Sequence, residues 1–371
     1  MAAFGYQNLC VLTDVFLILS VVFAGIHLIL MFRVWRAWKS YAPELSGVQA
    51  QVSIIIAARN EAENIEACLA HVFANVYAPG YEVIVVDDRS DDDSPAILRQ
   101  WVSQYPNLQV LRIDAVPKGM PPKKHALTVG ISAATSEILL FTDADCRVSS
   151  DWVVRMASAF DTDTEVVLGP GPYHAEPGLL NRLIRYETLH TAFWFLGRAK
   201  MGNPYMALGR NLAYRKSFFE RVGGFASGIE SLSGDDDLLV NHHAVGARTR
   251  VLMDVLVYSE PKRSWKVWYR QKMRHLQAGK WYRSGSMRYS SVALLSWIGV
   301  WVVAIASASL ASFGILAIFL VLRGYMLYIA GQKERKVSNI FVILPLLDCL
   351  LLLYHVLVIP VAGLIRNPKW N

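Results

Sequence analysis

Long apolar stretches constrain the fold of this chain more than any other feature. The first, residues 11–32, is apolar apart from Asp14 and His27. As a helix it spans about 33 Å, which is enough to cross the hydrocarbon core of a bilayer. Basic and aromatic residues follow it up to Lys39, a pattern typical of the cytoplasmic membrane interface. Because no basic segment and no small-residue cleavage site precede its apolar core, we expect a retained anchor rather than a signal peptide.

The second apolar stretch covers residues 290–330. One helix of that length would measure about 60 Å, roughly twice the thickness of the bilayer core. Two spans joined by a tight turn near Ser307–Ser309 therefore fit better.

A further span is expected over residues 339–365, where Pro345 and Pro360 interrupt the helix. Four crossings place the C-terminal basic residues outside, against the positive-inside pattern, and a bent or re-entrant last segment resolves that conflict. Asp348 lies at membrane depth in this stretch. Such a carboxylate is either functional or a packing contact between spans, and both interpretations stay open.

The segment between the apolar stretches alternates between strand and helix patterns. Its β-branched apolar runs predict buried strands. We expect Asn60 to cap the helix after the first strand, a basic loop over residues 117–124, and a helix from His125 to Ala134. This alternation predicts an α/β domain with a doubly wound, mostly parallel sheet. The expected strands cover residues 51–59, 81–86, 109–113, 138–141 and 166–168.

Two carboxylates follow the strand at residues 138–141. Asp143 and Asp145 are two residues apart, so in extended geometry they point to the same side. Open α/β sheets place ligands at the carboxyl ends of their strands, and hard oxygen donors there suit Mg²⁺ or Mn²⁺ with a diphosphate. A solvated turn also explains a lone Asp-x-Asp. The metal interpretation gains weight because a second strand ends in Asp87 and Asp88.

Seven short motifs between residues 52 and 240 follow an order that resembles the inverting family 2 glycosyltransferases. Each motif is weak alone, whereas seven in order are specific. The resemblance implies the GT-A fold, a nucleotide-binding α/β sheet with an appended acceptor region. No Gly-x-Gly-x-x-Gly follows the first strand, which argues against a dinucleotide enzyme. The motifs are residues 53–61, 85–90, 123–127, 142–145, 209–213, 223–225 and 234–236.

The resemblance implies roles at the nucleotide end of the site. Asp88, with Asp87 as a second candidate, would bind the uracil or ribose of a UDP-sugar. Glu61 and Lys124 would line the same pocket. Asp143 would contact the nucleotide sugar through the metal ion, which neutralises charge on the leaving diphosphate.

The last motif supplies the expected catalytic base. In the family the second acidic residue of a Gly-Glu-Asp motif has this role, which corresponds here to Asp236. It would take a proton from the acceptor hydroxyl as that oxygen attacks the anomeric carbon. Asp237 is the alternative base. Because Asp235, Asp236 and Asp237 are adjacent, we expect one raised pKa or a nearby cation that compensates their charge.

An amphipathic helix is expected from Trp265 onwards. Its polar side carries Gln271, Arg274 and His275, which resemble the Gln-x-x-Arg-Trp motif of membrane-bound members with His275 in place of Trp. We expect these residues to face the donor or acceptor while the apolar side lies on lipid. The replaced Trp argues against a Trp-lined polysaccharide channel. The apolar side is Trp265, Trp268, Tyr269, Met273 and Leu276.

Four regions are expected along the chain. They are an N-terminal anchor with a basic interface (1–40), a cytosolic GT-A domain (50–258), amphipathic interfacial helices (259–289) and a C-terminal transmembrane region of about three spans (290–371). We expect a multi-pass protein of a bacterial inner membrane with its catalytic domain in the cytoplasm. Although the net charge is +7, the positive residues cluster at membrane borders, so no nucleic-acid partner is expected.

The expected function is a metal-dependent, inverting hexosyltransferase. It would move a sugar from a UDP-sugar to a hydroxyl of a lipid embedded in the membrane. A small polysaccharide synthase and a polyprenyl-phosphate glycosyltransferase are the enzymatic alternatives. A membrane scaffold that binds a nucleotide sugar without catalysis is the non-enzymatic one.

Overall fold

The structure, a computed structural model, describes residues 2–39, 50–334 and 336–364. Its centre is a seven-stranded sheet in the order β3-β2-β1-β4-β7-β6-β8. All neighbours pair in parallel except β7, which is antiparallel to β4 and to β6. The strands are β1 (Val52–Ala58), β2 (Tyr81–Asp88), β3 (Leu108–Ile113), β4 (Ile138–Phe141), β6 (Val166–Leu168), β7 (Leu212–Arg215) and β8 (Thr249–Val251), and a separate ribbon pairs β5 (Cys146–Arg147) with β9 (Tyr258–Ser259).

The doubly wound, mostly parallel sheet expected from the sequence is therefore confirmed. Each of the five expected strands appears within two residues of its predicted ends. Alternate residues of β1 point to opposite faces, so Ile54 and Ile56 enter one hydrophobic core while Ile55 enters the other. Helices cover both faces, as a parallel sheet requires.

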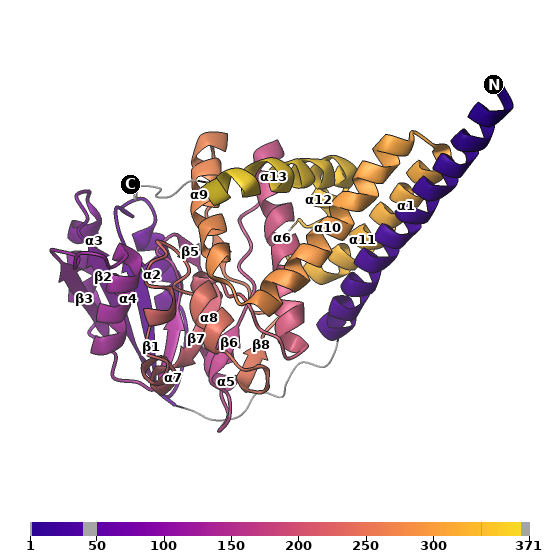
Figure 1. Cartoon of the computed structure of the whole chain (residues 1–371). Coiled ribbons are helices and arrows are strands. Elements are labelled where there is room, and N and C mark those ends of the chain that lie inside the picture. The colour runs from indigo at the N-terminus through magenta and orange to yellow at the C-terminus, as the bar shows by residue number, and fades with distance from the viewer. Residues whose placement is uncertain (1, 40–49, 335, 365–371) are drawn as a thin grey trace.

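Helices α2, α3 and α5 supply one core, and α4, α6, α7 and α8 supply the other. The long α6 is mostly buried and contacts both the sheet and the apolar helices, so it joins the two halves of the molecule (Figure 1). The helices are α1 (Ala2–Lys39), α2 (Ile65–Phe73), α3 (Ser94–Gln104), α4 (Pro122–Ala133), α5 (Trp152–Ser158), α6 (Leu179–Lys200), α7 (Lys216–Arg221), α8 (Asp237–His243), α9 (Trp265–Ala278), α10 (Ser284–Ser307), α11 (Leu310–Gly331), α12 (Ser338–Phe341) and α13 (Leu344–Leu364).

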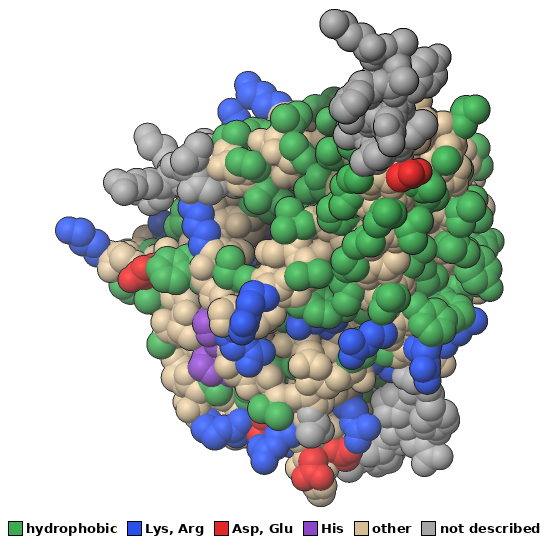
Figure 2. All heavy atoms as spheres, turned by 45° about the vertical axis from the view of Figure 1, so that its right-hand side comes forward, with side chains coloured by type: hydrophobic (Ala, Val, Ile, Leu, Met, Phe, Trp, Pro, Cys, Tyr) green, Lys and Arg blue, Asp and Glu red, His purple; other side chains and the backbone are tan. Residues whose placement is uncertain are grey.

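Four helices of the described chain are long and apolar enough to cross a membrane: Thr13–Lys39 of α1, α10, α11 and Leu344–Val361 of α13. Figure 1 shows α1, α10 and α11 side by side, with α13 inclined to them. Figure 2 shows hydrophobic side chains gathered over this half of the molecule, with Lys and Arg side chains along its lower border. This distribution is the one expected at a membrane–water boundary.

The turn expected between the second and third spans is present. Ala308 takes a left-handed conformation with φ +47°, and Ser309 caps α11 by accepting a hydrogen bond from the Ser312 amide. In the last span, the interruption expected at Pro345 is confirmed because α12 and α13 separate just before it. The interruption expected at Pro360 is wrong, since α13 continues to Leu364.

The charged C-terminal residues Arg366 and Lys369, on which the topology prediction depends, lie outside the described residues.

Candidate active site

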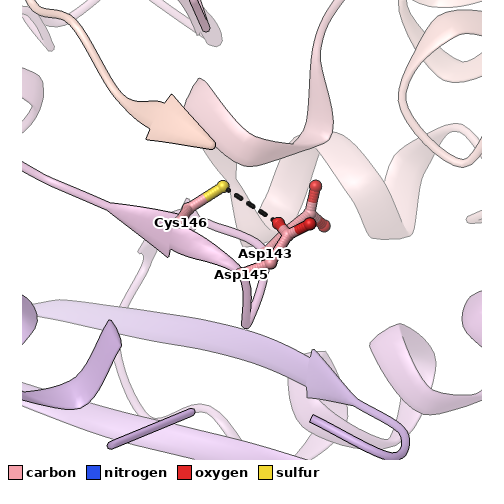
Figure 3. A group of neighbouring side chains, drawn as sticks. All are labelled: Asp143, Asp145 and Cys146. Atoms are coloured by element: carbon pink, nitrogen blue, oxygen red, sulfur yellow. Dashed lines mark hydrogen bonds between the residues drawn. The ribbon is translucent and has the colours of Figure 1, made fainter. Parts of the chain in front are cut away.

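The two carboxylates after β4 converge. Ligand atoms of Asp143, Asp145 and Cys146 lie within 4.8 Å of one another, and Figure 3 shows both carboxyl groups close together with the Cys146 thiol directed at Asp145. Burial raises the pKa of the Cys146 thiol well above its ordinary value, so it stays neutral. The two aspartates are therefore the hard oxygen donors of this group and fit a Mg²⁺ or Mn²⁺ ion.

Lys123 joins this pair to the acidic motif across the cleft. Its ammonium lies 3.0 Å from Asp143 and 3.2 Å from Asp235. Burial opposes its charge, but Asp143, Asp235 and Asp236 together raise the pKa of Lys123 well above its ordinary value. Burial would likewise raise the pKa of Asp143, yet Lys123, with smaller contributions from Arg210 and His275, lowers it. Asp143 is therefore an anion at neutral pH.

Lys124 does not reach this cleft, contrary to its expected place in the nucleotide pocket. Its ammonium is buried and donates to the carbonyls of Gly228, Ser231 and Ser233 at 2.6, 2.8 and 3.0 Å. All three of its N–H groups are used by these bonds. Lys124 therefore anchors the loop that leads into the acidic motif.

Lys123, and not Lys124, reaches the cleft because of the residue at which α4 begins. The sequence predicted a loop up to residue 124, but α4 begins at Pro122, where a proline suits the first helical turn. Successive helical residues point about 100° apart, so Lys123 faces the cleft while Lys124 faces the 228–233 loop.

The acidic motif presents Asp235 and Asp236 to the cleft. Both line a small pocket together with Ala57, Asp143 and Gly209. Asp236 accepts hydrogen bonds from the amides of Gly209 at 2.5 Å and of Asp237 at 2.8 Å. Burial, and then repulsion from Asp235, raise the pKa of Asp236 to about 6 against the opposing effect of Lys123. A carboxylate with that pKa suits a base that works near neutral pH.

Asp237 is held elsewhere. It accepts a hydrogen bond from the Ala207 amide at 3.3 Å and shares another with the Tyr282 side chain. Burial, followed by the charge of Asp236, raises its pKa well above the ordinary value. Three adjacent carboxylates were expected to require either a raised pKa or a nearby cation. Both are present, because Asp236 and Asp237 have raised pKa values and Lys123 lies beside Asp235.

Glu61 approaches the aspartates from the loop after β1. Burial raises its pKa to about 7, and Asp145 and Asp143 act in the same direction against Asn64 and Lys262. Lys262 also lies 3.6 Å from Asp145. The structure therefore brings Glu61 to the metal-site carboxylates, while its contact with a nucleotide stays a prediction.

The cap expected at Asn60 is wrong. Helix α2 begins four residues later, after Asn64, and Asn60 is left-handed with φ +54°. Its side-chain oxygen accepts a hydrogen bond from the Asp91 amide at 3.0 Å, and its own amide donates to Ser90. Asn60 therefore ties together the loops that follow β1 and β2, which form the edge of the site.

Asp87 and Asp88 end β2 beside these loops and are both buried. Arg112 donates to Asp87 at 2.9 Å, and Arg89 donates to Asp88 at 2.7 Å. Because Ala58 pairs with Asp87 in the parallel register, the strand ends that carry the acidic groups meet at one edge of the sheet. This edge is where open α/β sheets bind ligands.

Helix α9 begins as expected, with the Ser264 side chain capping the Val267 amide. His275 lies close enough to Asp143 to lower the pKa of that carboxyl, and the Arg274 carbonyl accepts a hydrogen bond from Ser233. Gln271 precedes His275 by one turn on the same face. His275 is thus brought to the aspartates, while contacts of Gln271 and Arg274 with a sugar nucleotide stay predictions.

The apolar side of α9 was expected on lipid, and this is wrong for two of its members. Trp268 is buried against Tyr354 of α13, with ring centroids 5.4 Å apart, and Met273 is also buried. Trp265 and Tyr269 are exposed. The α13 helix covers a side that the sequence pattern alone leaves open.

Comparison with known proteins agrees with this geometry. The family described as "Glycosyl transferase family 2" matches residues 53–223. Residues 53–223 form a glycosyltransferase family 2 domain. A mannosyltransferase from Pyrobaculum calidifontis, solved in complex with GDP-Man and Mn²⁺, superposes with a TM-score of 0.59 and 20% identity, over 92% of this chain and 99% of that one. This likeness confirms the GT-A fold.

Curated relatives of the transferase match it over only part of their own length. "Probable glycosyltransferase YdaM" of Bacillus subtilis is 27% identical over 64% of this chain and 56% of its own length. Glycosyltransferase AglE of Haloferax volcanii is 31% identical over 50% and 58%. A beta-monoglucosyldiacylglycerol synthase of Trichormus variabilis is 28% identical over 55% and 44%. The chain spans about half the length of the curated relatives it matches.

Neither Lys123 nor Arg210 is among the site residues expected from the sequence. The expectation fell on Lys124, although the proline at position 122 marks the helix start that separates the two lysines. Arg210 stacks on the Tyr173 ring at 4.6 Å, donates to the Gly171 carbonyl, and lowers the pKa of Asp143. Its position inside the 209–213 motif was the available signal.

Proposed function

We propose that this transferase moves a sugar, with inversion, from a UDP-sugar to a hydroxyl of a membrane lipid at the cytoplasmic face. The observation that carries the proposal is the pocket in which Asp236, a carboxylate with a pKa near 6, lies beside Asp143 and Gly209. A base and a metal-binding carboxylate on one pocket meet the needs of a single displacement at an anomeric carbon.

The donor end would be held by the acidic strand ends. Asp143 and Asp145 would bind Mg²⁺ or Mn²⁺, and such an ion neutralises charge on a departing diphosphate. Asp88 and Asp87 would hold the nucleoside, and Glu61 would line the pocket. The mannosyltransferase of similar fold was solved with GDP-Man and Mn²⁺, so a guanine nucleotide belongs among the donors to be tested.

The reaction itself would be carried by the residues around Asp236. Its carboxylate takes the proton of the acceptor hydroxyl while that oxygen forms a bond to the anomeric carbon. The bond from this carbon to the diphosphate breaks on the opposite side, and the nucleoside diphosphate leaves. Lys123 and Arg210 place positive charge where the leaving group gains negative charge. His275, with Gln271 and Arg274 beside it, would position the sugar or the acceptor.

A lipid acceptor is supported by the architecture around the pocket. Four apolar helices pack against the catalytic half through α6 and α9. Among the relatives, the Trichormus protein is named for synthesis of a diacylglycerol glucoside. The basic border in Figure 2 supports a multi-pass protein whose catalytic half is cytoplasmic.

The test is nucleotide release by the purified full chain in detergent. UDP-sugars and GDP-mannose are each supplied with diacylglycerol, ceramide or a polyprenyl phosphate, and with Mn²⁺ or EDTA. We expect release that requires Mn²⁺ and one lipid and that is lost in Asp143→Ala and Asp236→Asn. The anomeric configuration of the product, read by NMR, reports inversion.

Asp237→Asn is the matched control, because its carboxyl is adjacent but does not line the pocket. Full activity of Asp236→Asn with a polyprenyl phosphate would favour that acceptor, which is already an anion and needs no strong base. Release without any lipid, coupled to a growing glycan, would favour a polysaccharide synthase. Binding of a nucleotide sugar without release of the nucleotide would favour the non-enzymatic alternative, a membrane scaffold.

A further inference from the structure

A second cavity lies among the apolar helices and is separate from the Asp143 cleft. It has a volume of about 240 Å³ and is enclosed by residues of α1, α6, α10 and α13. Its walls include polar and ionisable side chains, with His27, His190, Arg198 and Tyr289 among them. Polar and ionisable groups among membrane helices are costly and generally have a function.

Two buried donors on its wall have no hydrogen-bond partner among the described residues. Arg198 is only 8% exposed, and its guanidinium is stacked on the rings of Tyr205 at 4.5 Å and Tyr289 at 4.2 Å. Its Nη1 atom and the Tyr289 hydroxyl have no hydrogen-bond partner in the described part of the chain. No carboxylate there forms an ion pair with Arg198. Buried donors without partners are rare in native proteins, so they indicate a bound group that supplies acceptors and negative charge.

The cavity opens to the surface between α10 and α13. Ser290 is exposed, and Leu294 of α10 and Ile359 of α13 are partly exposed at its edge. Large apolar side chains of the same two helices, including Leu295 and Leu357, face outward beside it at 61% and 62% exposure. A ligand with an anionic head and long apolar chains matches both the inside and the rim.

The polar end of the cavity faces the catalytic half. Tyr205 contacts Tyr282 with ring centroids 6.3 Å apart, and Tyr282 is hydrogen-bonded to Asp237, the neighbour of Asp236. A headgroup beside Arg198 would thus be separated from the acidic motif by one layer of tyrosine side chains. The cavity and the active site are neighbours, yet they share no lining residue.

We propose that this cavity binds the phosphate headgroup of an anionic lipid. Arg198 and Tyr289 donate to the phosphate oxygens, and the lipid chains leave between α10 and α13. Arginine suits this role because its planar fork matches phosphate geometry. The site requires no sugar nucleotide, so the proposal stands or falls independently of the proposed transfer reaction.

The experiment is native mass spectrometry of the detergent-purified full chain, titrated with phosphatidic acid, diacylglycerol or inorganic phosphate. We expect phosphatidic acid to bind with one-to-one stoichiometry and diacylglycerol to bind at least tenfold more weakly. Arg198→Gln should weaken phosphatidic acid binding by about 10- to 100-fold, the range for a charged hydrogen bond. Arg36→Gln, a change at an exposed arginine in the last turn of α1, should leave it unchanged.

Tyr289→Phe is a second variant, chosen because it should not disturb folding. The hydroxyl it removes has no partner to lose, so this variant should keep its thermal stability and lose part of its phosphatidic acid binding. Equal binding of diacylglycerol and phosphatidic acid, or unchanged binding in both Arg198→Gln and Tyr289→Phe, would overturn the proposal. Inorganic phosphate that binds as tightly as the lipid would replace it with a site for a soluble anion.

Discussion

Two clusters of buried charge in this protein are built in opposite ways. In the cleft, Lys123 serves Asp143 and Asp235 at once, and Asp236 lies close enough to share its influence. Among the apolar helices, Asp348 has its own arginine, Arg323, at 2.9 Å. The cleft therefore holds more negative charge than its lysine compensates, whereas the helix pair is balanced.

Asp348 is also saturated with hydrogen bonds. Besides Arg323 of α11 it accepts bonds from Tyr186 of α6 and from Trp297 and Trp301 of α10, at 2.6, 2.9 and 3.1 Å. Its carboxylate is fully buried and joins four helices. This arrangement favours a packing contact over a functional site. Burial of a carboxylate alone does not mark function, whereas an unbalanced set of charges beside a pocket does.

The largest contrast is expected from removing the catalytic carboxylate. Asp236→Asn should lower turnover by about 10²–10⁴-fold, the range for a general base, with a loss of unfolding free energy of at most about 1–3 kcal/mol. Burial disfavours the charged form of Asp236 and raises its pKa, but an amide has one acceptor oxygen where the carboxylate uses two, so one of the bonds from the Gly209 and Asp237 amides is lost. Steady-state kinetics and a thermal melt measure the two effects. A lower melting temperature together with intact turnover would reverse the assignment.

Asp348→Ala should do the opposite. It leaves Arg323 buried without its carboxylate, which costs about 3–5 kcal/mol of unfolding free energy. Denaturation in detergent measures the loss, and turnover per folded molecule should stay close to normal. The double variant Arg323→Met with Asp348→Leu removes both charges and should recover most of the stability. If it is no more stable than Asp348→Ala, the balanced-pair interpretation is wrong.

Substitutions of the two adjacent lysines should likewise differ, one affecting stability and the other turnover. Lys124→Met leaves three carbonyls without their donor and should lower stability by about 1–3 kcal/mol. Lys123→Met should keep the fold and lower turnover, because it removes the cation between the two acidic groups. Paired melts and rates of the two variants test this, and equal melting temperatures would contradict it.

The smallest effect is a pH dependence. A base must be ionised, so the rate should be level above about pH 7, half-maximal near the pKa of Asp236, about 6, and lower below it. The fall should approach tenfold per pH unit. Measured kcat/KM between pH 5 and 8 with a saturating divalent ion checks this, with the pH stability of the protein as the control. A rate that rises toward pH 5 would exclude Asp236 as the base.

Much of the architecture was predictable from local pattern. Apolar runs of membrane length and β-branched runs of strand length have few other uses, so the spans and five of the seven strands of the sheet appear close to where the sequence placed them. Asp143 and Asp145 could be paired from their spacing alone, since residues two apart on an extended segment share a side. The family motifs added Asp236.

The sequence by itself determined the elements and the family, and only the tertiary structure decided which side chains meet. The roles of Lys123 and Lys124 depend on where α4 begins and on the 228–233 loop, which is about 100 residues away in sequence. The buried face of α9 depends on α13, and the partners of Asp348 come from three other helices. Local periodicity specifies a helix and its faces, but contacts between distant segments specify what each face meets.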